Sequence, residues 1–433
     1  MTRRMFCLAL SLTACAGAVD PHRVGTPDRP SGHTSAVTHD AIDDRHDSAV
    51  AGGDVAAAKD YASANNAFGF ELWQRTRAAG NLAIAPASVS LALGMTWAGA
   101  RGQTAAQMSK ALRMHDVDGM TTSMGQQLAR WNDPAHRDQF ELTVVDRLFG
   151  EQSARFEPDF LALMKDRMGA PLEPVDFIGG WEAARARING WVEDSTKDRI
   201  RDLLPAGSLD TDTRLVLTNA VYFKGDWQQP FDRDHTHAAD FFVGGTKKIS
   251  TKTMHQSAYL GYADLGDAQL VELPYRGGQL ALDIVLPKAK DGLDALERDL
   301  DDADFAAAVA KLEPQFVDLA LPKFKLEMSS SLQLKAALKA MGIVDAFSGS
   351  ADFSGISTTI KPLFIDDVYH KTFVALDEKG TEAAAATAVV MRTESAAVAP
   401  DGVDVTADHP FLFVLRDTTS GAVLFIGHVA DPR

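Results

Sequence analysis

The order of apolar patterns along the chain predicts a mixed α+β fold. Apolar residues recur at helical spacing early in the chain, over 61–77, 89–97, 160–164 and 188–192. Strand-like apolar runs dominate from residue 215 onward and do not alternate regularly with helices. A doubly wound sheet needs that alternation, so the order favours separate helical and strand regions. No internal repeat and no clean domain boundary are visible after residue 56.

The predicted helices rest on spacing and on their start signals. Ala64, Phe68 and Leu72 follow one face of the first predicted helix. Pro86 and Ser88 stand near the start of the second, which is strongly apolar over 89–97. A further helix is predicted over 332–341.

The predicted strands are short apolar runs separated by turn residues. The runs 270–273 and 280–286 flank Arg276, Gly277 and Gly278, a combination typical of a hairpin. The remaining predicted strands are 215–217, 221–223, 316–321, 373–376, 411–415 and 423–426.

Composition narrows the function classes. The chain has 433 residues, of which 45% are hydrophobic, so it can bury a sizeable core. Its formal charge is −16, and no dense stripe of Lys and Arg is present, which argues against nucleic-acid binding. No apolar run approaches the roughly 20 residues of a membrane-spanning helix.

The first fifteen residues predict export and lipidation. Arg3 and Arg4 precede a short apolar stretch over 6–14, which is typical of a signal peptide. The segment ends in LTAC, which resembles a bacterial lipobox, so we expect cleavage after residue 14 and a lipid on Cys15. The only other cysteine, Cys7, lies in the removed segment, so no disulfide is expected in the folded part.

The predicted organisation has three parts. They are a lipoprotein signal peptide (1–14), the lipidated Cys15 with a flexible linker (15–55), and a folded domain (56–433). The linker is rich in Gly, Pro, Asp, His, Ser and Thr and shows no period. We expect a cell-envelope lipoprotein, and Ala16 after the cysteine favours the outer membrane in a cell with two membranes. Whether it faces the periplasm or the outside stays open.

Familiar catalytic motifs are absent from the sequence. There is no G-x-S-x-G nucleophile elbow, no H-E-x-x-H zinc motif, no P-loop and no G-x-G-x-x-G. These absences lower the expectation of an enzyme without removing it, because catalytic groups can be scattered along a chain. We predict no metal and no cofactor.

Residues 377–408 form an unusually long segment of small and polar residues between two apolar strands. One interpretation is a short Ala-rich helix followed by a disordered loop. The other follows a period of two, in which every second residue from Thr381 to Met391 is small or apolar. The alternate set, which includes Glu382 and Arg392, holds both charges. Such a segment can become a strand in a sheet without burying a charge.

Several motifs in order over about residues 57–433 resemble the serpin family. They are NLAIAPASVS (81–90), GARGQT (99–104), LTNAVYFKGDW (217–227), VELPY (271–275), EKGTEAAAAT (378–387), DHPFLF (408–413) and GHV (427–429).

The resemblance implies a serpin fold of three β-sheets with eight or nine helices and an exposed reactive-centre loop, here about 378–408. It also implies a metastable monomer that is not an enzyme. A target serine protease attacks the loop, forms a covalent complex, and is trapped when the cut loop inserts into the large sheet. The alternative is a serpin-fold binding protein that does not inhibit.

The resemblance also implies roles for loop residues. The hinge consists of Glu378, Gly380, Thr381, Ala383, Ala384, Ala385 and Ala386. Family spacing places the cut between Glu394 and Ser395, which implies a Glu-preferring protease. Because the stretch beyond Ser395 is longer than in many relatives, a cut between Arg392 and Thr393 by a trypsin-like protease is the alternative.

Five further positions match family residues beneath and beside the opening sheet. Ser88, Asn219 and His370 resemble a buried polar cluster, in which Ala85 replaces a family serine, so we expect a smaller network. Lys323 matches the partner of Glu378, and Trp227 matches the residue where insertion begins. No basic helix resembles a heparin site, so no activation by glycosaminoglycans is expected.

Overall fold

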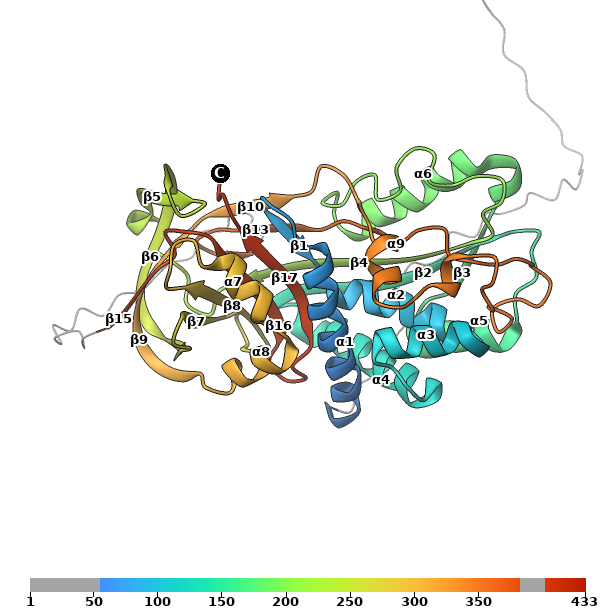
Figure 1. Cartoon of the computed structure of the whole chain (residues 1–433), viewed down its shortest axis with the longest axis horizontal. Coiled ribbons are helices and arrows are strands. Elements are labelled where there is room, and N and C mark those ends of the chain that lie inside the picture. The colour runs from blue at the N-terminus through green and yellow to red at the C-terminus, as the bar shows by residue number, and fades with distance from the viewer. Residues whose placement is uncertain (1–54, 382–401) are drawn as a thin grey trace, which may run out of the picture. The chain divides into compact units, whose positions relative to one another are not determined.

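Helices occupy the first part of the chain and strands most of the rest, so the structure confirms the predicted α+β fold (Figure 1). The structure is a computed structural model, and it describes residues 55–381 and 402–433. The predicted signal peptide, Cys15 and almost all of the predicted linker lie outside the described residues.

Nine α-helices and three short 3₁₀ helices are present in the described residues. They are α1 (Val55–Thr76), α2 (Pro86–Ala98), α3 (Gly102–Leu112), α4 (Val117–Trp131), α5 (Pro158–Met168), α6 (Phe177–Ser195), α7 (Leu293–Asp299), α8 (Asp302–Val309), α9 (Lys335–Ala340), η1 (Pro134–His136), η2 (Arg233–His235) and η3 (Asp345–Phe347).

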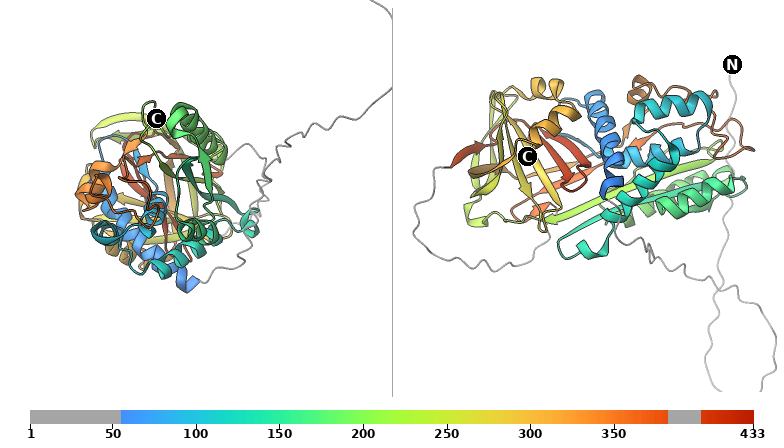
Figure 2. Two further views of the ribbon diagram at one scale, coloured as in Figure 1. Left: turned by 90° about the vertical axis from the view of Figure 1, so that its right-hand side faces the viewer. Right: turned by 90° about the horizontal axis from the view of Figure 1, so that it is seen from below.

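The larger sheet of the described residues has nine strands. Its order is β1 (Leu82–Ile84), β17 (Val423–Val429), β16 (Phe411–Asp417), β8 (Leu280–Pro287), β7 (Ala268–Pro274), β6 (Lys247–Asp264), β9 (Glu313–Pro322) and β15 (Val403–Thr406), with β5 (His237–Val243) also paired to β6. Its β15 end lies at the opposite end of the domain from α6 in two views (Figures 1 and 2).

The six-stranded sheet carries the candidate site. Its order is β10 (Phe324–Glu327), β13 (Phe373–Leu376), β14 (Gly380–Thr381), β4 (Leu215–Asp226), β2 (Phe140–Glu151) and β3 (Leu172–Val175). A third, two-stranded sheet pairs β11 (Leu332–Gln333) with β12 (Tyr369–His370).

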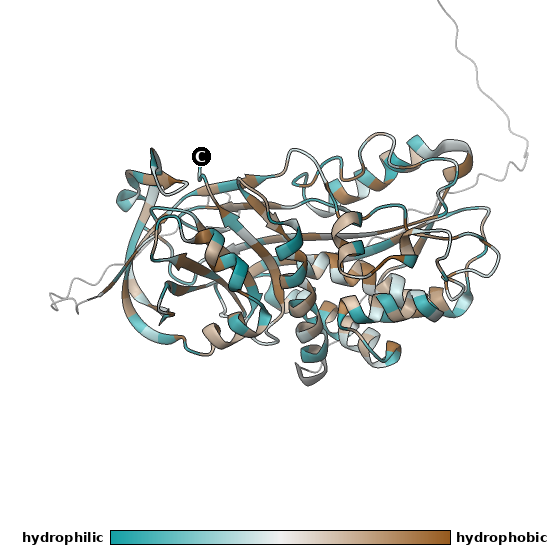
Figure 3. Cartoon of the chain, viewed as in Figure 1, coloured by the Kyte–Doolittle hydropathy of each residue, from teal (hydrophilic) through white to brown (hydrophobic). Residues whose placement is uncertain are grey.

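The core lies around α2 and the central strands. Eleven of the thirteen residues of α2 are buried, as expected for a helix that is apolar on all sides. Every residue of β16 and β17 is buried as well. Figure 3 shows the hydrophobic colour along these inner strands. Helix α2 contacts β4 of the six-stranded sheet and β17 of the nine-stranded sheet, so this core joins the two sheets.

Two details differ from the sequence prediction. The runs 215–217 and 221–223 form one continuous strand, β4, because β2 pairs with it from Leu215 to Gly225. The helix predicted over 332–341 is wrong at its start, since Leu332 and Gln333 pair with β12 and α9 begins at Lys335. In the described residues, no helix combines the length and apolarity needed to cross a bilayer.

Candidate functional site

The start of the long segment already forms a strand inside the six-stranded sheet. Gly380 and Thr381 make up β14, which lies between β13 and β4 and runs antiparallel to both. Thr381 pairs with Leu376 on one side and with Gly225 on the other. The chain therefore leaves the described residues from a position between two central strands.

A tight turn over residues 377–380 leads into β14, and donors from Trp227 and Phe231, which follow β4, hold it. The amide of Gly380 donates to the carbonyl oxygen of Asp377 at 3.2 Å, and the reverse bond is 2.9 Å. Trp227 donates twice: its indole Nε1 binds the carbonyl of Asp377 at 3.0 Å, and its amide binds that of Lys379 at 2.7 Å. The amide of Phe231 binds the carbonyl of Glu378 at 2.9 Å.

Glycine at position 380 is required by this close approach. Gly380 has φ +156°, and a Cβ placed on it would lie 1.8 Å from the carbonyl oxygen of Gly225. No side chain fits at that distance, because the obstacle is backbone. The sequence therefore has glycine at the predicted hinge for a steric reason.

Lys323 and Glu378 form the ion pair that the resemblance implies. The Lys323 Nζ lies 2.7 Å from a carboxylate oxygen of Glu378, whose residue is 5% exposed. Burial is the largest single influence and acts to raise the pKa of Glu378, but the hydrogen bond from Lys323, further hydrogen bonds and the charge of Lys323 together outweigh it, so the pKa is lowered. Lys323 is itself positioned by a 2.9 Å bond from its amide to the carbonyl of Lys252.

The side chain of Thr381 points into the protein. Its hydroxyl lies 2.5 Å from the hydroxyl of Tyr275, which is fully buried. The Tyr275 ring stacks on Trp227 with centroids 4.5 Å apart. Burial raises the pKa of Tyr275, so its hydroxyl stays protonated and can donate to Thr381.

Beyond β14, toward Leu215, the edge of β4 has no strand partner among the described residues. Within the described part of the chain, β4 pairs with β2 from Leu215 to Gly225, whereas on its other edge only Gly225 and Asp226 are paired. A cavity of about 310 Å³ lies at the lower end of this edge. It is lined by the first residues of β4, by α2 and by the segment 362–370.

The predicted polar cluster borders this cavity. His370 is buried, and its Nε2 accepts a 3.0 Å hydrogen bond from the amide of Ala85. Burial lowers the pKa of His370 to about 4, so the ring is neutral, with its proton on Nδ1. Ala85 thus contributes a backbone donor at the position where the resemblance implies a serine, and Ser88 lines the same cavity. The side chain of Asn219 lies outside the described residues.

The sequence analysis missed three residues that shape this site. Gly225 receives the close approach of Gly380, and Tyr275 meets Thr381. Asp146 of β2 is buried and is the register partner of Asn219 in β4. Gly225 and Tyr275 stood within quoted motifs, but pairing between distant strands cannot be inferred from one sequence.

The remaining predicted site residues lie outside the described residues. They are the hinge alanines Ala383, Ala384, Ala385 and Ala386, the bond Glu394–Ser395, its alternative Arg392–Thr393, and the lipidation site Cys15. Among the residues that are described, no cluster of three or more His, Cys, Asp and Glu side chains can hold a metal ion.

Strand β14 lies between β13 and β4, and residues 382–401 connect it to β15 of the nine-stranded sheet, within a mixed α+β fold. Comparison with known proteins shows the family to which this fold belongs. The family model described as serpin (serine protease inhibitor) matches residues 63–432. The chain therefore belongs to the serpin family.

The match to similar proteins covers almost the whole length of each of them. The leukocyte elastase inhibitor of Xenopus laevis is 38% identical over 385 residues, covering 86% of this chain and 99% of that protein. Serpin B3 of Homo sapiens is 35% identical over 389 residues, with 85% and 98% covered. Among solved structures, cleaved Serpin 42Da has a TM-score of 0.78 at 28% identity, covering 87% of this chain and 100% of that one.

Proposed function

We propose that this protein inhibits serine endopeptidases by acting as a suicide substrate. A protease cuts the loop, and the cut loop then inserts into the six-stranded sheet while the protease is still attached as an acyl-enzyme. The observation that carries the proposal is β14, which already occupies the slot between β13 and β4. The names of the relatives, among them an elastase inhibitor, support the same function.

The register of β14 sets how far the loop can insert. Thr381 faces Gly225 in an antiparallel pair, so the residue numbers of facing partners sum to 606. Continued along β4, this register places Met391 opposite Leu215, the first residue of that strand. Arg392 to Glu394 would then extend just past the end of β4, where an attached protease has room.

Side-chain alternation supports the same strand. Thr381 is buried and contacts Tyr275, so its set of alternate residues, 383, 385, 387, 389 and 391, would face inward as well. All of these are Ala, Thr, Val or Met. Glu382 and Arg392 fall in the outward set, so no charge would be buried on insertion.

The chemistry of the first step is that of ordinary proteolysis. The protease serine oxygen attacks the carbonyl carbon of Glu394, the bond to the Ser395 nitrogen breaks, and that amine leaves with a proton. The product is an ester between the protease serine and Glu394. Insertion of 381–394 at about 3.3 Å per residue moves this ester by on the order of 45 Å. The displacement distorts the protease active site, so water does not complete the hydrolysis.

A panel of proteases tests this proposal. Purified 56–433 is mixed with Glu-specific, trypsin-like and elastase-like serine proteases and run on denaturing gels. We expect a covalent band at the summed mass less that of residues 395–433, together with a released peptide that begins at Ser395. A peptide that begins at Thr393 would move the cut to Arg392. Complete cleavage without the band would refute trapping and favour a non-inhibitory serpin-fold binding protein.

We further propose that a lipid on Cys15 holds this inhibitor at a bacterial cell envelope. The lipobox-like LTAC and the absence of any cysteine after it support the anchor. Expression of the full chain in a bacterium with radiolabelled palmitate should label the protein and place it in the membrane fraction. The Cys15→Ser variant should lose the label, and an equally labelled variant would contradict the assignment.

A further inference from the structure

Tyr259 is the most exposed large hydrophobic residue of the described chain, with 63% of its surface accessible. It lies on β6 directly opposite Phe316 of β9, and the two rings meet edge to face with centroids 5.4 Å apart. Single exposed aromatic residues are common and need no explanation on their own. The position of this pair beside the end of the loop indicates a role in binding.

The aromatic pair lies at the point where the reactive loop rejoins the fold. The loop returns to the described residues at Gly402, next to Val403, where β15 begins on the edge of β9. A Cβ placed on Gly402 would lie 3.2 Å from the Phe316 ring and 2.5 Å from a carboxylate oxygen of Asp318. The Phe316 ring therefore separates the end of the loop from Tyr259.

Two acidic residues lie near the same pair in the sheet. Asp318 follows Phe316 by two residues on the same face of β9 and accepts a hydrogen bond from Ser257. Asp404 is its register partner on β15 and is exposed. An exposed aromatic ring beside two carboxylates attracts a guanidinium or ammonium group through its π face and through charge. We define the Tyr259 patch as Tyr259, Phe316, Asp318 and Asp404.

A protease bound at the proposed cut would reach this patch. Gly402 follows Ser395 by seven positions, and seven extended residue steps span at most about 24 Å. A protease domain of about 200 residues has a radius of gyration near 16 Å, so it is roughly 40 Å across. A body of that size, held on so short a tether, overlaps the surface of β6 and β9.

From these observations we infer that the Tyr259 patch is a second contact surface for the target protease, and that it binds a Lys or Arg side chain on the protease face beyond the leaving-group side of the cut. This inference rests on the proposed function for its partner but not on the trapping step. It gives the protein selectivity for proteases with a basic surface there, in addition to the residue at the cut.

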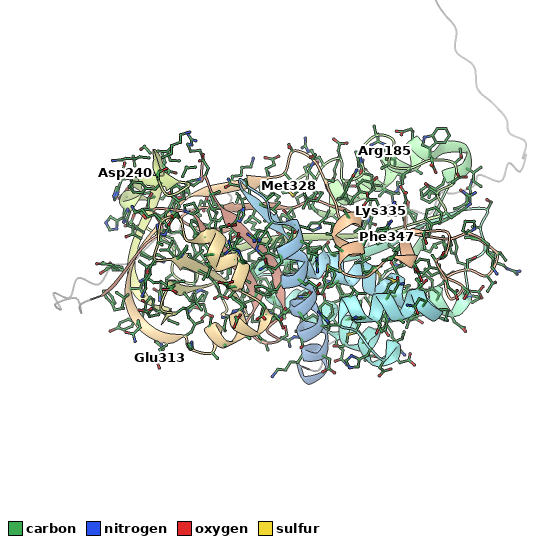
Figure 4. All side chains as sticks on the ribbon, in the orientation of Figure 1. Arg185, Asp240, Glu313, Met328, Lys335 and Phe347 are labelled. Atoms are coloured by element: carbon green, nitrogen blue, oxygen red, sulfur yellow. The ribbon has the colours of Figure 1, made fainter. Side chains whose placement is uncertain are left out.

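Trp181 of α6 provides a matched control. It is another exposed aromatic residue, with 37% of its surface accessible. Figure 4 labels Arg185 on the same helix at the opposite end of the domain from Asp240 of β5 and Glu313 of β9. A protease on the loop end cannot contact both regions, so Trp181→Ser reports only the general effect of removing an exposed aromatic.

The test measures binding without chemistry. Trypsin and a Glu-specific serine protease, each with its catalytic serine replaced by alanine, are titrated against residues 56–433. We expect Tyr259→Ser to weaken the binding of at least one of them three- to tenfold, and Trp181→Ser to leave it unchanged. Asp404→Asn should weaken the same complex mainly at low salt, since its contribution is a screened charge.

The outcomes separate this inference from the trapping proposal. If Tyr259→Ser and Trp181→Ser bind the inactive proteases with equal affinity, the inference that the Tyr259 patch contacts the protease is refuted. It is also refuted if neither inactive protease binds the wild type. A wild type that binds through Tyr259 but forms no covalent complex with the active proteases would refute trapping and retain the patch.

Discussion

At the scale of single residues, two neighbouring Lys–Glu pairs differ in burial, and we expect them to differ in their contribution to stability. Lys323 binds the buried Glu378, whereas Lys325 binds Glu327 at 2.5 Å with side chains that are 59% and 56% exposed. Removing Lys323 leaves a buried carboxylate without its main partner. Removing Lys325 exposes nothing that water does not already solvate.

We therefore predict different costs for the same substitution. Lys323→Met should lower the free energy of unfolding by about 1–3 kcal/mol, and Lys325→Met by less than about 0.5 kcal/mol. Urea unfolding of the two variants at pH 7 provides the measurement. Equal losses would show that the buried pair at the hinge contributes no more than a surface pair.

His370 gives a prediction about acid. Its folded pKa of about 4 lies below the ordinary value of 6.5, so the unfolded chain binds a proton more readily than the folded one. The stabilising contribution is complete above pH 6.5 and is lost as the pH falls toward 4. Protonation of Nε2 would also remove the acceptor that binds the amide of Ala85.

The size of this loss of stability follows from the difference between the folded pKa of His370 and its ordinary value. Between pH 7 and pH 4.5 the wild type should lose about 2–3 kcal/mol of stability through this one group. His370→Asn has an amide oxygen that can accept from Ala85 but does not titrate, so its loss over the same range should be smaller by that amount. The free energy of unfolding of both proteins is measured by urea unfolding between pH 7 and pH 4.5. If it falls equally with pH in the two proteins, His370 is not an acid-sensitive group.

At the scale of elements, the alternation of the inserted strand sets which positions tolerate charge. Thr381 faces inward at the point where insertion begins, so Thr381→Arg would place a charge against Tyr275 and Trp227. We expect this variant to be cut as a substrate, with most of the protease released active. Ala384→Arg belongs to the outward set and should still form the covalent complex.

The measurement for this pair is the number of inhibitor molecules consumed for each protease inactivated. Thr381→Arg should raise that number at least severalfold, and Ala384→Arg should leave it near the wild-type value. If both variants inhibit equally, insertion does not follow the alternation read from β14, and the register along β4 is wrong.

Sequence patterns predicted this fold well where the pattern is local. The helix over 61–77 and the strands around 270–286 were found because period and turn residues are contiguous. The helix predicted over 332–341 was wrong at its start because pairing with β12 outweighed a helical period. Recognition of family motifs predicted that Lys323 pairs with Glu378 and that Trp227 lies where insertion begins. It did not supply Tyr275 or Gly225, whose contacts depend on how strands far apart in sequence are aligned.

At the scale of the whole molecule, the proposed mechanism requires that the intact chain is not in its state of lowest free energy. Residues 381–391 would pair along β4 if the loop were free to enter, and about one net hydrogen bond per residue at about 1 kcal/mol each gives roughly 10 kcal/mol. The uncut chain cannot gain this energy, because its loop is also tied to β15 at Gly402. A cut near Glu394 releases that constraint.

We predict that a single nick near Glu394 raises the melting temperature by more than about 10 °C, since a domain of this size shifts by roughly 1 °C for each kcal/mol. Limited cleavage of the loop near Glu394 with a catalytic amount of a metalloprotease, which forms no acyl-enzyme and so is not trapped, followed by calorimetry, measures the gain. Nicked Thr381→Arg is the control, because its loop is cut but blocked from the slot, so it should melt close to the uncut protein. A wild-type chain that is fully nicked yet melts at its original temperature would mean that the loop stays outside the sheet. The tension between a tethered loop and an open strand edge, on which the inhibitory mechanism depends, would then be absent.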